Sequence, residues 1–544
     1  MEFSTIDYAV FISYILGIVG LGLWVSRDKK GHQKDSKDYF LASKALPWWA
    51  IGASLIAANI SAEQFIGMSG SGFAIGLAIA SYEWMAAITL IIVGKYFLPI
   101  FIEKELYTIP EFIEKRFSTN LKTILAVFWV ALFIFVNLTS VLFLGGKAID
   151  TIIGTGDGSM IFYAILGLAF IAAAYSLYGG LSAVAWTDVL QVILLVIGGL
   201  ITTVIALNHV TPEGGIFNGL SHIYNQAGDK FHMILQKDNP EFSNLPGIAV
   251  LVGGMWVANL YYWGFNQYII QRTLAAKSIK EAQRGIAFAA FLKLIIPLIV
   301  VIPGIVAYVM FSQPEGTAII PGVQEAFSNG SGGINYDKAY PWLISYFIPT
   351  GLKGLVLAAL TAAIVSSLAS MLNSTSTIFT MDIFKPYINK NASEKTLVTV
   401  GRLTAAAALL IAVAMAPVMG NIPQMFQYIQ EYTGLVSPGI LAVFMMGLFW
   451  KKATNQGAIV GVISSILVAF LLKNPALELP FMDQMLYTML ITMVIIAGVS
   501  LTTSEYDDPK GIELRASIFK TGPAFNISAY SILLVLVVLY AIFW

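Results

Sequence analysis

The sequence predicts an all-α integral membrane protein with about fourteen membrane-spanning helices. Of its 544 residues, 57% are hydrophobic and only 11% are charged, whereas soluble globular chains carry about 25% charged residues. Apolar stretches of roughly 20 residues, the length a bilayer-spanning helix requires, recur along the whole chain. Most charged side chains lie between these stretches. Lipid is therefore the expected outer solvent of most of the chain.

Fourteen stretches are long and apolar enough to span a bilayer. The first is too long for the apolar region of a signal peptide, and no small-residue cleavage pattern follows it, so we expect it to be a span. The predicted spans cover approximately residues 5–26, 48–74, 76–102, 121–148, 158–178, 183–208, 247–271, 285–311, 346–383, 398–419, 422–449, 455–473, 481–502 and 524–544.

The basic residues predict the orientation of these spans. Most of the 31 lysines and arginines fall in the odd-numbered connections, and basic connections favour the cytoplasmic side. Both termini are therefore expected on the extracytoplasmic side. The outer connections 209–246 and 312–345 are expected to be ordered loops or short helices, and we find no soluble segment large enough for an enzyme module.

Charge and composition exclude several classes of function. A net charge of zero argues against a nucleic-acid partner. The lack of cysteine excludes disulfides, thiolate metal sites and a cysteine nucleophile. The four histidines lie in polar connections, so an intramembrane histidine site is not expected. We expect no enzymatic activity and no organic cofactor, and no obligate protein partner is evident.

Polar residues interrupt the second predicted span. It carries Asn59, Ser61, Glu63 and Gln64, and glycines follow in the next eight residues. This pattern is typical of a discontinuous helix, whose free backbone carbonyls bind a cation while its side chains bind a solute. The alternative is a continuous helix whose small residues permit close packing.

The seventh predicted span contains amides beside aromatic rings. The run from Asn259 to Gln267 includes Tyr261, Tyr262 and Trp263. An aromatic belt at the membrane interface is the alternative, although a belt does not require amides. Aromatic faces and amides together suit a sugar ring and its hydroxyls. Because five positions separate the two interrupted spans, spans two to six and seven to eleven are interpreted as two inverted five-helix repeats.

Three ionisable residues lie within other spans: Glu83, Asp188 and Lys293. A charge at the bilayer centre costs ~2.5–3.5 kcal/mol on insertion scales, so each is expected to have a partner. A purely structural Glu83–Lys293 pair is one alternative. A position of Asp188 in the headgroup region is another.

Hydroxyls in the ninth span form a candidate cation site. Ser366 and Ser367 lie within a helical turn of the Ala363 carbonyl, and hard neutral oxygens of this kind suit Na⁺. The alternative is that both serines bond back to carbonyls of their own helix. The eleventh span begins with a polar and aromatic run, 424–432, which is either interfacial or closes one side of a cavity.

Several stretches resemble the sodium/solute symporter family and, within it, the bacterial sodium/galactose (glucose) symporters. The resemblance covers nearly the whole chain and implies a leucine-transporter-like fold of two inverted five-helix repeats with two discontinuous helices. The strongest stretches are Leu23–Lys30, Ser54–Gly72, Ser81–Trp84, Tyr178–Ala183, Trp186–Val189, Asn259–Ala276 and Ile364–Thr375. The implied parts are a leading helix and basic loop (1–47), the first repeat (48–208), an outer loop (209–246), the second repeat (247–450) and three trailing helices (451–544).

The resemblance also implies a function and residue roles. The chain would import a neutral sugar with Na⁺ as the co-transported ion, by alternating access across the bacterial plasma (inner) membrane. The implied sugar contacts are Gln64, Glu83, Asn259, Lys293 and Gln430, and the implied gate residues are Tyr262, Trp263, Met68, Phe426, Tyr82 and Asn59. The implied Na⁺ ligands are the carbonyls of Ala57, Ile60 and Ala363 with the hydroxyls of Ser366 and Ser367, and Asp188 would help the ion leave inward.

Two positions depart from the pattern of the sugar symporters. Ala86 stands in place of a serine and Phe133 in place of a tyrosine, and each lost hydroxyl removes a hydrogen bond of ~0.5–1.5 kcal/mol. These changes bear on which hexose is preferred. The alternatives that stay open are a Na⁺ symporter of proline, sialic acid or inositol, proton coupling through Asp188 or Glu63, and a membrane sensor without transport.

Overall fold

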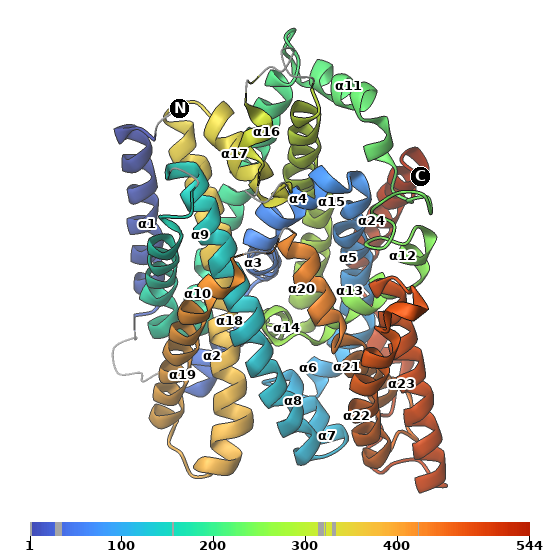
Figure 1. The fold of residues 1–544 in the computed structure, drawn as a ribbon. Helices are drawn as coiled ribbons and strands as arrows, with labels where there is room; N and C mark the ends of the chain where they lie inside the picture. Colours follow the sequence, from blue (N-terminus) through green and yellow to red (C-terminus); the bar gives the residue numbers. More distant parts are fainter. Residues whose placement is uncertain are drawn as a thin grey trace.

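The fold, seen in a computed structural model, is built from helices (Figure 1). The structure describes residues 3–27, 35–154, 157–313, 320, 322–328, 333–420, 422 and 424–544. Within these ranges the β-structure consists of two isolated bridges, Leu46 with Ala276 and Ser328 with Ile334. The basic residues Lys29, Lys30 and Lys34 of the first connection lie outside the described residues.

The first half of the chain contributes fourteen α-helices to the described part. Three-residue to six-residue helices with 3-10 or π geometry connect or extend them. The α-helices are α1 (Thr5–Val25), α2 (Ser36–Leu41), α3 (Trp48–Asn59), α4 (Ser69–Ala74), α5 (Ser81–Ile92), α6 (Leu98–Glu103), α7 (Ile109–Arg116), α8 (Thr119–Leu132), α9 (Thr139–Ile153), α10 (Ile161–His209), α11 (Ile216–Gln226), α12 (Ile248–Val252), α13 (Gly254–Phe265) and α14 (Gln267–Leu274).

The second half of the described chain contains ten further α-helices, of 4 to 33 residues. They are α15 (Ile279–Phe311), α16 (Val323–Ala326), α17 (Ala339–Phe347), α18 (Leu352–Ile378), α19 (Glu394–Met415), α20 (Met425–Gly434), α21 (Ser437–Phe449), α22 (Asn455–Leu472), α23 (Phe481–Thr503) and α24 (Pro523–Ile542). The ninth predicted span therefore begins at Leu352 rather than near residue 346, because α17 is a separate helix that ends at Phe347.

Ten helices within the described residues are long and apolar enough to cross a bilayer. The pair α20 and α21, bent by 48°, makes an eleventh if it counts as one span. The chain is therefore a multi-pass membrane protein. Three predicted spans, 48–74, 158–178 and 247–271, correspond to shorter helical segments, so the count of fourteen stays a prediction.

The second predicted span is divided in the structure. Helix α3 ends at Asn59, Ile60 is extended with φ −81° and ψ 104°, and the π-helix η2 (Glu63–Met68) follows. The Ser61 hydroxyl accepts a hydrogen bond from the N–H of Glu63, the first residue of η2, at 3.0 Å. The side chains at this break are small or polar. Polar side chains can hydrogen-bond to the backbone N–H and C=O groups that the break leaves unpaired, whereas apolar side chains cannot.

Helix α10 contains the boundary between the fifth and sixth predicted spans. Gly180 lies at this boundary with φ 61° and ψ −153°, a conformation that favours glycine. A Cβ atom there would lie 2.3 Å from the Tyr39 carbonyl oxygen, so glycine is also required for the close approach of α2. The two spans are thus separated by a kink rather than a loop.

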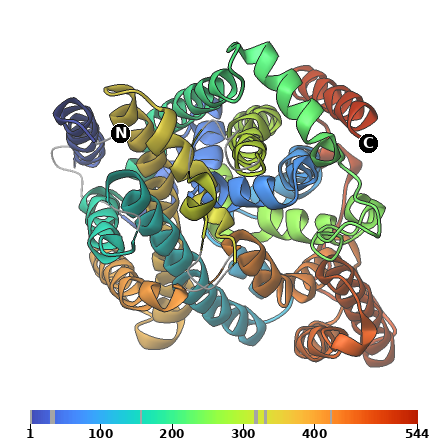
Figure 2. The same cartoon turned by 45° about the horizontal axis from the view of Figure 1, so that its top comes forward.

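Helix α18 forms the centre of the bundle, and its residues from Val356 to Ile378 are all buried. It packs against α10, α1, α3 and α19. The alanines and serines of α18 permit this close approach of neighbouring helices. Figure 2 shows the last helix, α24, lying apart from the α22–α23 pair at the periphery of the bundle.

Candidate functional site

A small polar cavity lies between the divided segment and helices α5, α13, α15 and α20. Its volume is about 60 Å³, room for a few water molecules. Of the residues named in advance as sugar contacts or gates, the cavity lining includes Asn59, Gln64, Tyr82, Glu83, Asn259, Tyr262, Trp263, Lys293, Phe426 and Gln430. Met68 is fully buried but is not among the lining residues.

A buried ion pair forms one wall of this cavity. Lys293 of α15 donates hydrogen bonds to the Glu83 carboxylate of α5 and to the side-chain oxygen of Asn59. The Lys293 ammonium also lies 5.0 Å from the ring centroid of Trp263. Pairing offsets the cost of burying both charges. The predicted Glu83–Lys293 pair is thus present, and it sits in the cavity lining.

Tyr262 closes one end of the cavity through hydroxyl contacts. Its hydroxyl accepts hydrogen bonds from Asn59 Nδ2 at 2.9 Å and from the Tyr268 hydroxyl at 2.7 Å. The Tyr262 and Trp263 rings meet edge-on at 5.2 Å. This end faces α14, whose start follows an extended residue, Asn266 (φ −85°, ψ 121°).

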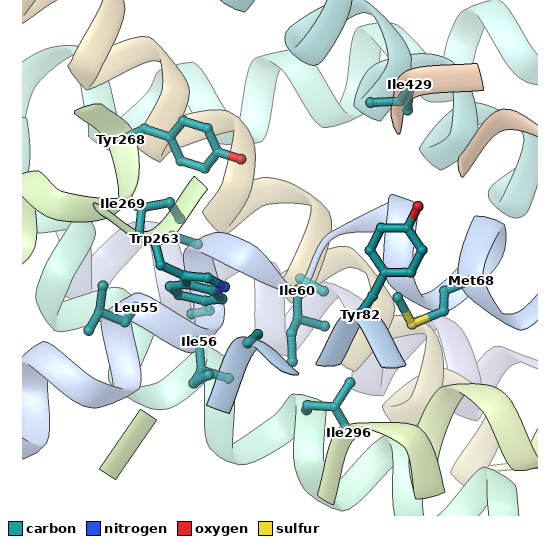
Figure 3. Packing of buried hydrophobic residues seen from close by; sticks show 14 of the residues in the cluster. Leu55, Ile56, Ile60, Met68, Tyr82, Trp263, Tyr268, Ile269, Ile296 and Ile429 are labelled. Carbon is teal, nitrogen blue, oxygen red and sulfur yellow. The ribbon is translucent and has the colours of Figure 1, made fainter. Parts of the chain in front are cut away.

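Apolar side chains close the other end of the cavity. The Tyr82 and Phe426 rings meet edge-on with centroids 5.1 Å apart. A Cβ atom at Gly67 would lie 2.9 Å from the Cβ of Phe426, so η2 and α20 touch here. In Figure 3, Met68 and Tyr82 appear at one end of the view and Trp263 and Tyr268 at the other, with Ile60 between them.

Three amides near the cavity differ in how firmly they are held. Gln64 Oε1 accepts a hydrogen bond from the Ser61 N–H at 3.0 Å. Asn259 Nδ2 donates to the Met255 carbonyl at 3.2 Å, and Gln430 is half-buried. Gln267, which the amide pattern grouped with Asn259, instead bonds to α7 through the Ile109 N–H at 2.8 Å.

A second polar cluster lies between α3 and α18. The Ser367 hydroxyl donates to the Ala58 carbonyl at 2.9 Å and lies 3.5 Å from the Ala57 carbonyl oxygen. The Ser366 hydroxyl donates to Asp188 Oδ1 at 2.5 Å. Both hydroxyls therefore bond to other helices, and not to their own carbonyls. Among the predicted Na⁺ ligands, Ile60 and Ala363 are also fully buried.

Asp188 has a cationic partner that the sequence did not indicate. Its carboxylate lies 3.6 Å from Arg272 Nη2 of α14, and both side chains have zero exposure. Asp188 also accepts a hydrogen bond from Ser54, and Arg272 donates to Ser54 and Ser370. Arg272 lies inside the Asn259–Ala276 stretch that resembles the symporter family, which is the feature of the sequence that could have drawn attention to it.

The two residues that differ from the pattern of the sugar symporters, Ala86 and Phe133, lie in different parts of the site. Ala86 lines the cavity. Phe133 is fully buried and packs edge-on against Tyr268 at 5.5 Å, behind the Tyr262 end. Glu63 also lines the cavity, and its buried Oε1 atom has no hydrogen-bond partner in the part of the chain that the structure describes. The sequence placed Glu63 among the polar residues of the second span and as an alternative site of proton coupling, but not among the sugar contacts.

The chain belongs to the sodium:solute symporter family, whose description matches residues 39–465. It is 65% identical over 542 residues to the sodium/glucose cotransporter of Vibrio parahaemolyticus, an alignment covering 99% of this chain and 98% of that protein. It is 34% identical to human sodium/myo-inositol cotransporter 2, covering 93% and 78% of the two chains. Mouse sodium/glucose cotransporter 1 is 32% identical, with 85% and 70% covered.

A solved structure shares the fold. It is a Na⁺-coupled sialic acid symporter in a substrate-bound outward-open state, with a TM-score of 0.78 and 23% sequence identity. The match covers 92% of this chain and 99% of that one. At this identity the comparison supports the arrangement of helices, and it carries no statement about the substrate.

Proposed function

We propose that this chain imports a neutral sugar, galactose or glucose, together with Na⁺. The observation that carries the proposal is the buried Glu83–Lys293 pair in the cavity lining. The two charges cancel, so the pair offers both donors and acceptors to hydroxyl groups without attracting an ion. The 65% identical sodium/glucose cotransporter supports the same substrate class.

We place the Na⁺ ion between α3 and α18. The ligands are the carbonyls of Ala57, Ile60 and Ala363 and the hydroxyls of Ser366 and Ser367. Support comes from the Ser367 hydroxyl, which already meets carbonyls at the end of α3. An ion here holds the divided segment that carries Asn59 and Gln64. Asp188, hydrogen-bonded to Ser366, then accepts the ion as it leaves inward.

Transport proceeds by alternating access around the cavity. The cavity of about 60 Å³ is far smaller than the ~300–1,000 Å³ of ligand pockets, so sugar entry requires the walls to separate. Met68, Tyr82 and Phe426 form the outer gate and Tyr262, held by Asn59, forms the inner gate with Trp263 beside it. One Na⁺ moving inward through 100 mV supplies ~2.3 kcal/mol.

The proposed topology has fourteen spans. The ten long helices and the bent pair are joined by three shorter segments, 48–74, 158–178 and 247–271. Residues 48–208 and 247–450 form inverted five-helix repeats whose first spans are discontinuous. Residues 1–47 precede them, 209–246 form an outer loop and 451–544 trail. Both termini face outward from the bacterial inner membrane.

Myo-inositol is the second candidate substrate. Several relatives that are 34–36% identical carry the name sodium/myo-inositol cotransporter 2. Inositol, like a hexose, is a neutral ring bearing hydroxyls, so the same amides and ion pair suit it.

Uptake into proteoliposomes tests the function. An inward Na⁺ gradient should drive accumulation of labelled galactose or glucose, with myo-inositol and proline compared in the same preparation. Ser367→Ala should abolish the dependence on Na⁺. Ser376→Ala should preserve it, because it removes a hydroxyl of the same helix that has no hydrogen-bond partner among the described residues. Uptake that ignores the Na⁺ gradient contradicts the coupling, and unchanged uptake by Ser367→Ala contradicts the ion site.

A further inference from the structure

An apolar groove opens on the membrane-facing side between α15 and α24. Its volume is about 520 Å³, and its walls include Phe288, Phe291 and Leu294 of α15 and Ile532 and Val535 of α24. Helix α24 packs against α15 and α5. Figure 2 shows α24 at the edge of the bundle, separate from α22 and α23. We propose that this groove binds one anionic phospholipid, with an acyl chain between the helices and the headgroup at Arg284.

The length of the groove fits one leaflet of a bilayer. On α15 the lining runs over 284–294, which is about 15 Å at 1.5 Å per residue. On α24 it runs over 524–535, which is about 16 Å by the same rise. The hydrocarbon core of a bilayer is about 30 Å thick, so the groove has the depth of one acyl layer.

The end of the groove where both helices begin carries the polar and charged groups. Arg284 lines it and is 52% exposed. Trp48, 37% exposed, lines the same end and packs edge-on against Phe288 at 5.7 Å. A tryptophan at this depth is typical of the membrane–water interface. In the proposed topology this end is cytoplasmic.

Charge complementarity selects the headgroup. Among the described residues, Arg284 pairs with Glu281, with 3.8 Å between Nη1 and Oε1. Glu281 also accepts a hydrogen bond from the backbone N–H of Trp48 at 2.8 Å. A guanidinium has five donors arranged to bind phosphate oxygens. Lys277, just before α15, and Lys280, in its first turn, are both exposed. Basic groups at a cytoplasmic groove between spans favour an anionic lipid.

The groove shares a helix with the central cavity. Leu294 lines the groove, while its neighbour Lys293 lines the cavity. The Leu294 carbonyl accepts a hydrogen bond from Trp84 Nε1 at 3.4 Å, and the Trp84 ring lies 6.0 Å from Tyr540 of α24. A lipid in the groove would therefore join α24 to the helix that positions Lys293, and it should raise the unfolding temperature of the whole chain.

Native mass spectrometry of the full-length protein tests the proposal. The purified protein is mixed with phosphatidylglycerol or with phosphatidylcholine of the same chains, and retained lipid is counted. Wild type should retain phosphatidylglycerol preferentially. Arg284→Gln should weaken that retention about fivefold, roughly the factor one basic side chain contributes near anionic lipid. Arg515→Gln is the matched control, since Arg515 is exposed and lies 3.9 Å from Glu513 in the same kind of pair.

A second variant tests the acyl-chain part of the groove. Ser531 is exposed and lines the groove, so Ser531→Phe fills it from outside without disturbing the core. This variant should lose the retained lipid and the rise in unfolding temperature that phosphatidylglycerol gives wild type. Equal retention of the two lipids by wild type, or unchanged retention by both Arg284→Gln and Ser531→Phe, overturns the proposal.

Discussion

Arg272 shows how one residue fixes the contacts of several helices. Its fully buried guanidinium faces Asp188 of α10, Ser54 of α3 and Ser370 of α18, and it donates to the Tyr268 carbonyl within α14. A buried ion pair adds little net stability, but removal of one partner leaves an uncompensated charge and costs 3–5 kcal/mol. The pair is therefore better understood as fixing which helices meet than as a source of stability.

Asp188→Asn should destabilise the protein by about 3–5 kcal/mol, because it leaves the Arg272 charge buried without its partner. Replacement of both members, Asp188→Leu with Arg272→Met, should recover most of that loss. Thermal unfolding in lipid nanodiscs, followed through the 11 tryptophans, measures both. A double variant less stable than Asp188→Asn would contradict this account.

The role of a residue could be predicted from the sequence where the residues of a single segment were enough to indicate it. The run containing Asn59 and Gln64 indicated a discontinuous helix, and intramembrane Glu83 and Lys293 required partners. The Arg272–Asp188 contact was not predictable, because it depends on how α10, α14, α3 and α18 cross one another. Such crossings are set by side-chain packing across helices, which no single stretch of sequence displays.

At the scale of elements, the division after α3 places backbone carbonyls beside α18. The Ala58 carbonyl accepts the Ser367 hydroxyl at the turn where α3 ends. The polar run 59–64 indicated where the chain departs from a regular helix. The second extended residue, Asn266, is less evident in the sequence, because aromatic residues surround it and an interfacial belt has the same composition.

The crossing of α15 over α4 depends on a glycine. A Cβ atom at Gly304 would lie 2.1 Å from the Ser69 carbonyl oxygen and 2.9 Å from the Phe73 nitrogen. Gly304→Ala should therefore separate the two helices, lower the unfolding temperature and cost about 1–3 kcal/mol. Gly498→Ala is the control, because nothing lies within 4 Å of a Cβ there and alanine favours a helix by about 0.5–1 kcal/mol. Equal unfolding temperatures for the two variants would contradict the close contact between α15 and α4 at Gly304.

At the scale of the whole molecule, one outer segment joins several helices. The 3-10 helix η7 (Tyr336–Lys338) lies against α4, since a Cβ at Gly70 would meet Tyr336 backbone atoms at 2.9 Å. Asp337 accepts a hydrogen bond from the Met425 N–H of α20 at 3.3 Å. Lys147 of α9 lies 3.9 Å from Asp337 Oδ2 and donates to Asn335 at 3.0 Å. We interpret this cluster as a latch that holds the outer end closed.

The latch should respond to pH through Asp337. Burial raises its pKa to about 6, although the nearby Lys147 ammonium acts in the opposite direction. In an open, hydrated arrangement the pKa returns to about 3.9. The closed form therefore binds the proton more tightly, so closure is favoured as pH falls below about 6, and the effect saturates below about 4. Above pH 6 the carboxylate is charged in both forms and closure loses this contribution.

Thiol labelling at the cavity measures this equilibrium. The chain has no cysteine, so Ala86→Cys places a single thiol in the cavity lining, and a membrane-impermeant reagent is applied from outside. The labelling rate of Ala86→Cys should fall between pH 7.5 and 5. The fall should be several-fold larger than in the double variant Ala86→Cys with Asp337→Asn, because the amide mimics the protonated acid at every pH. The ratio of the two rates cancels the titration of the thiol itself. A ratio that stays constant with pH would show that Asp337 does not control closure.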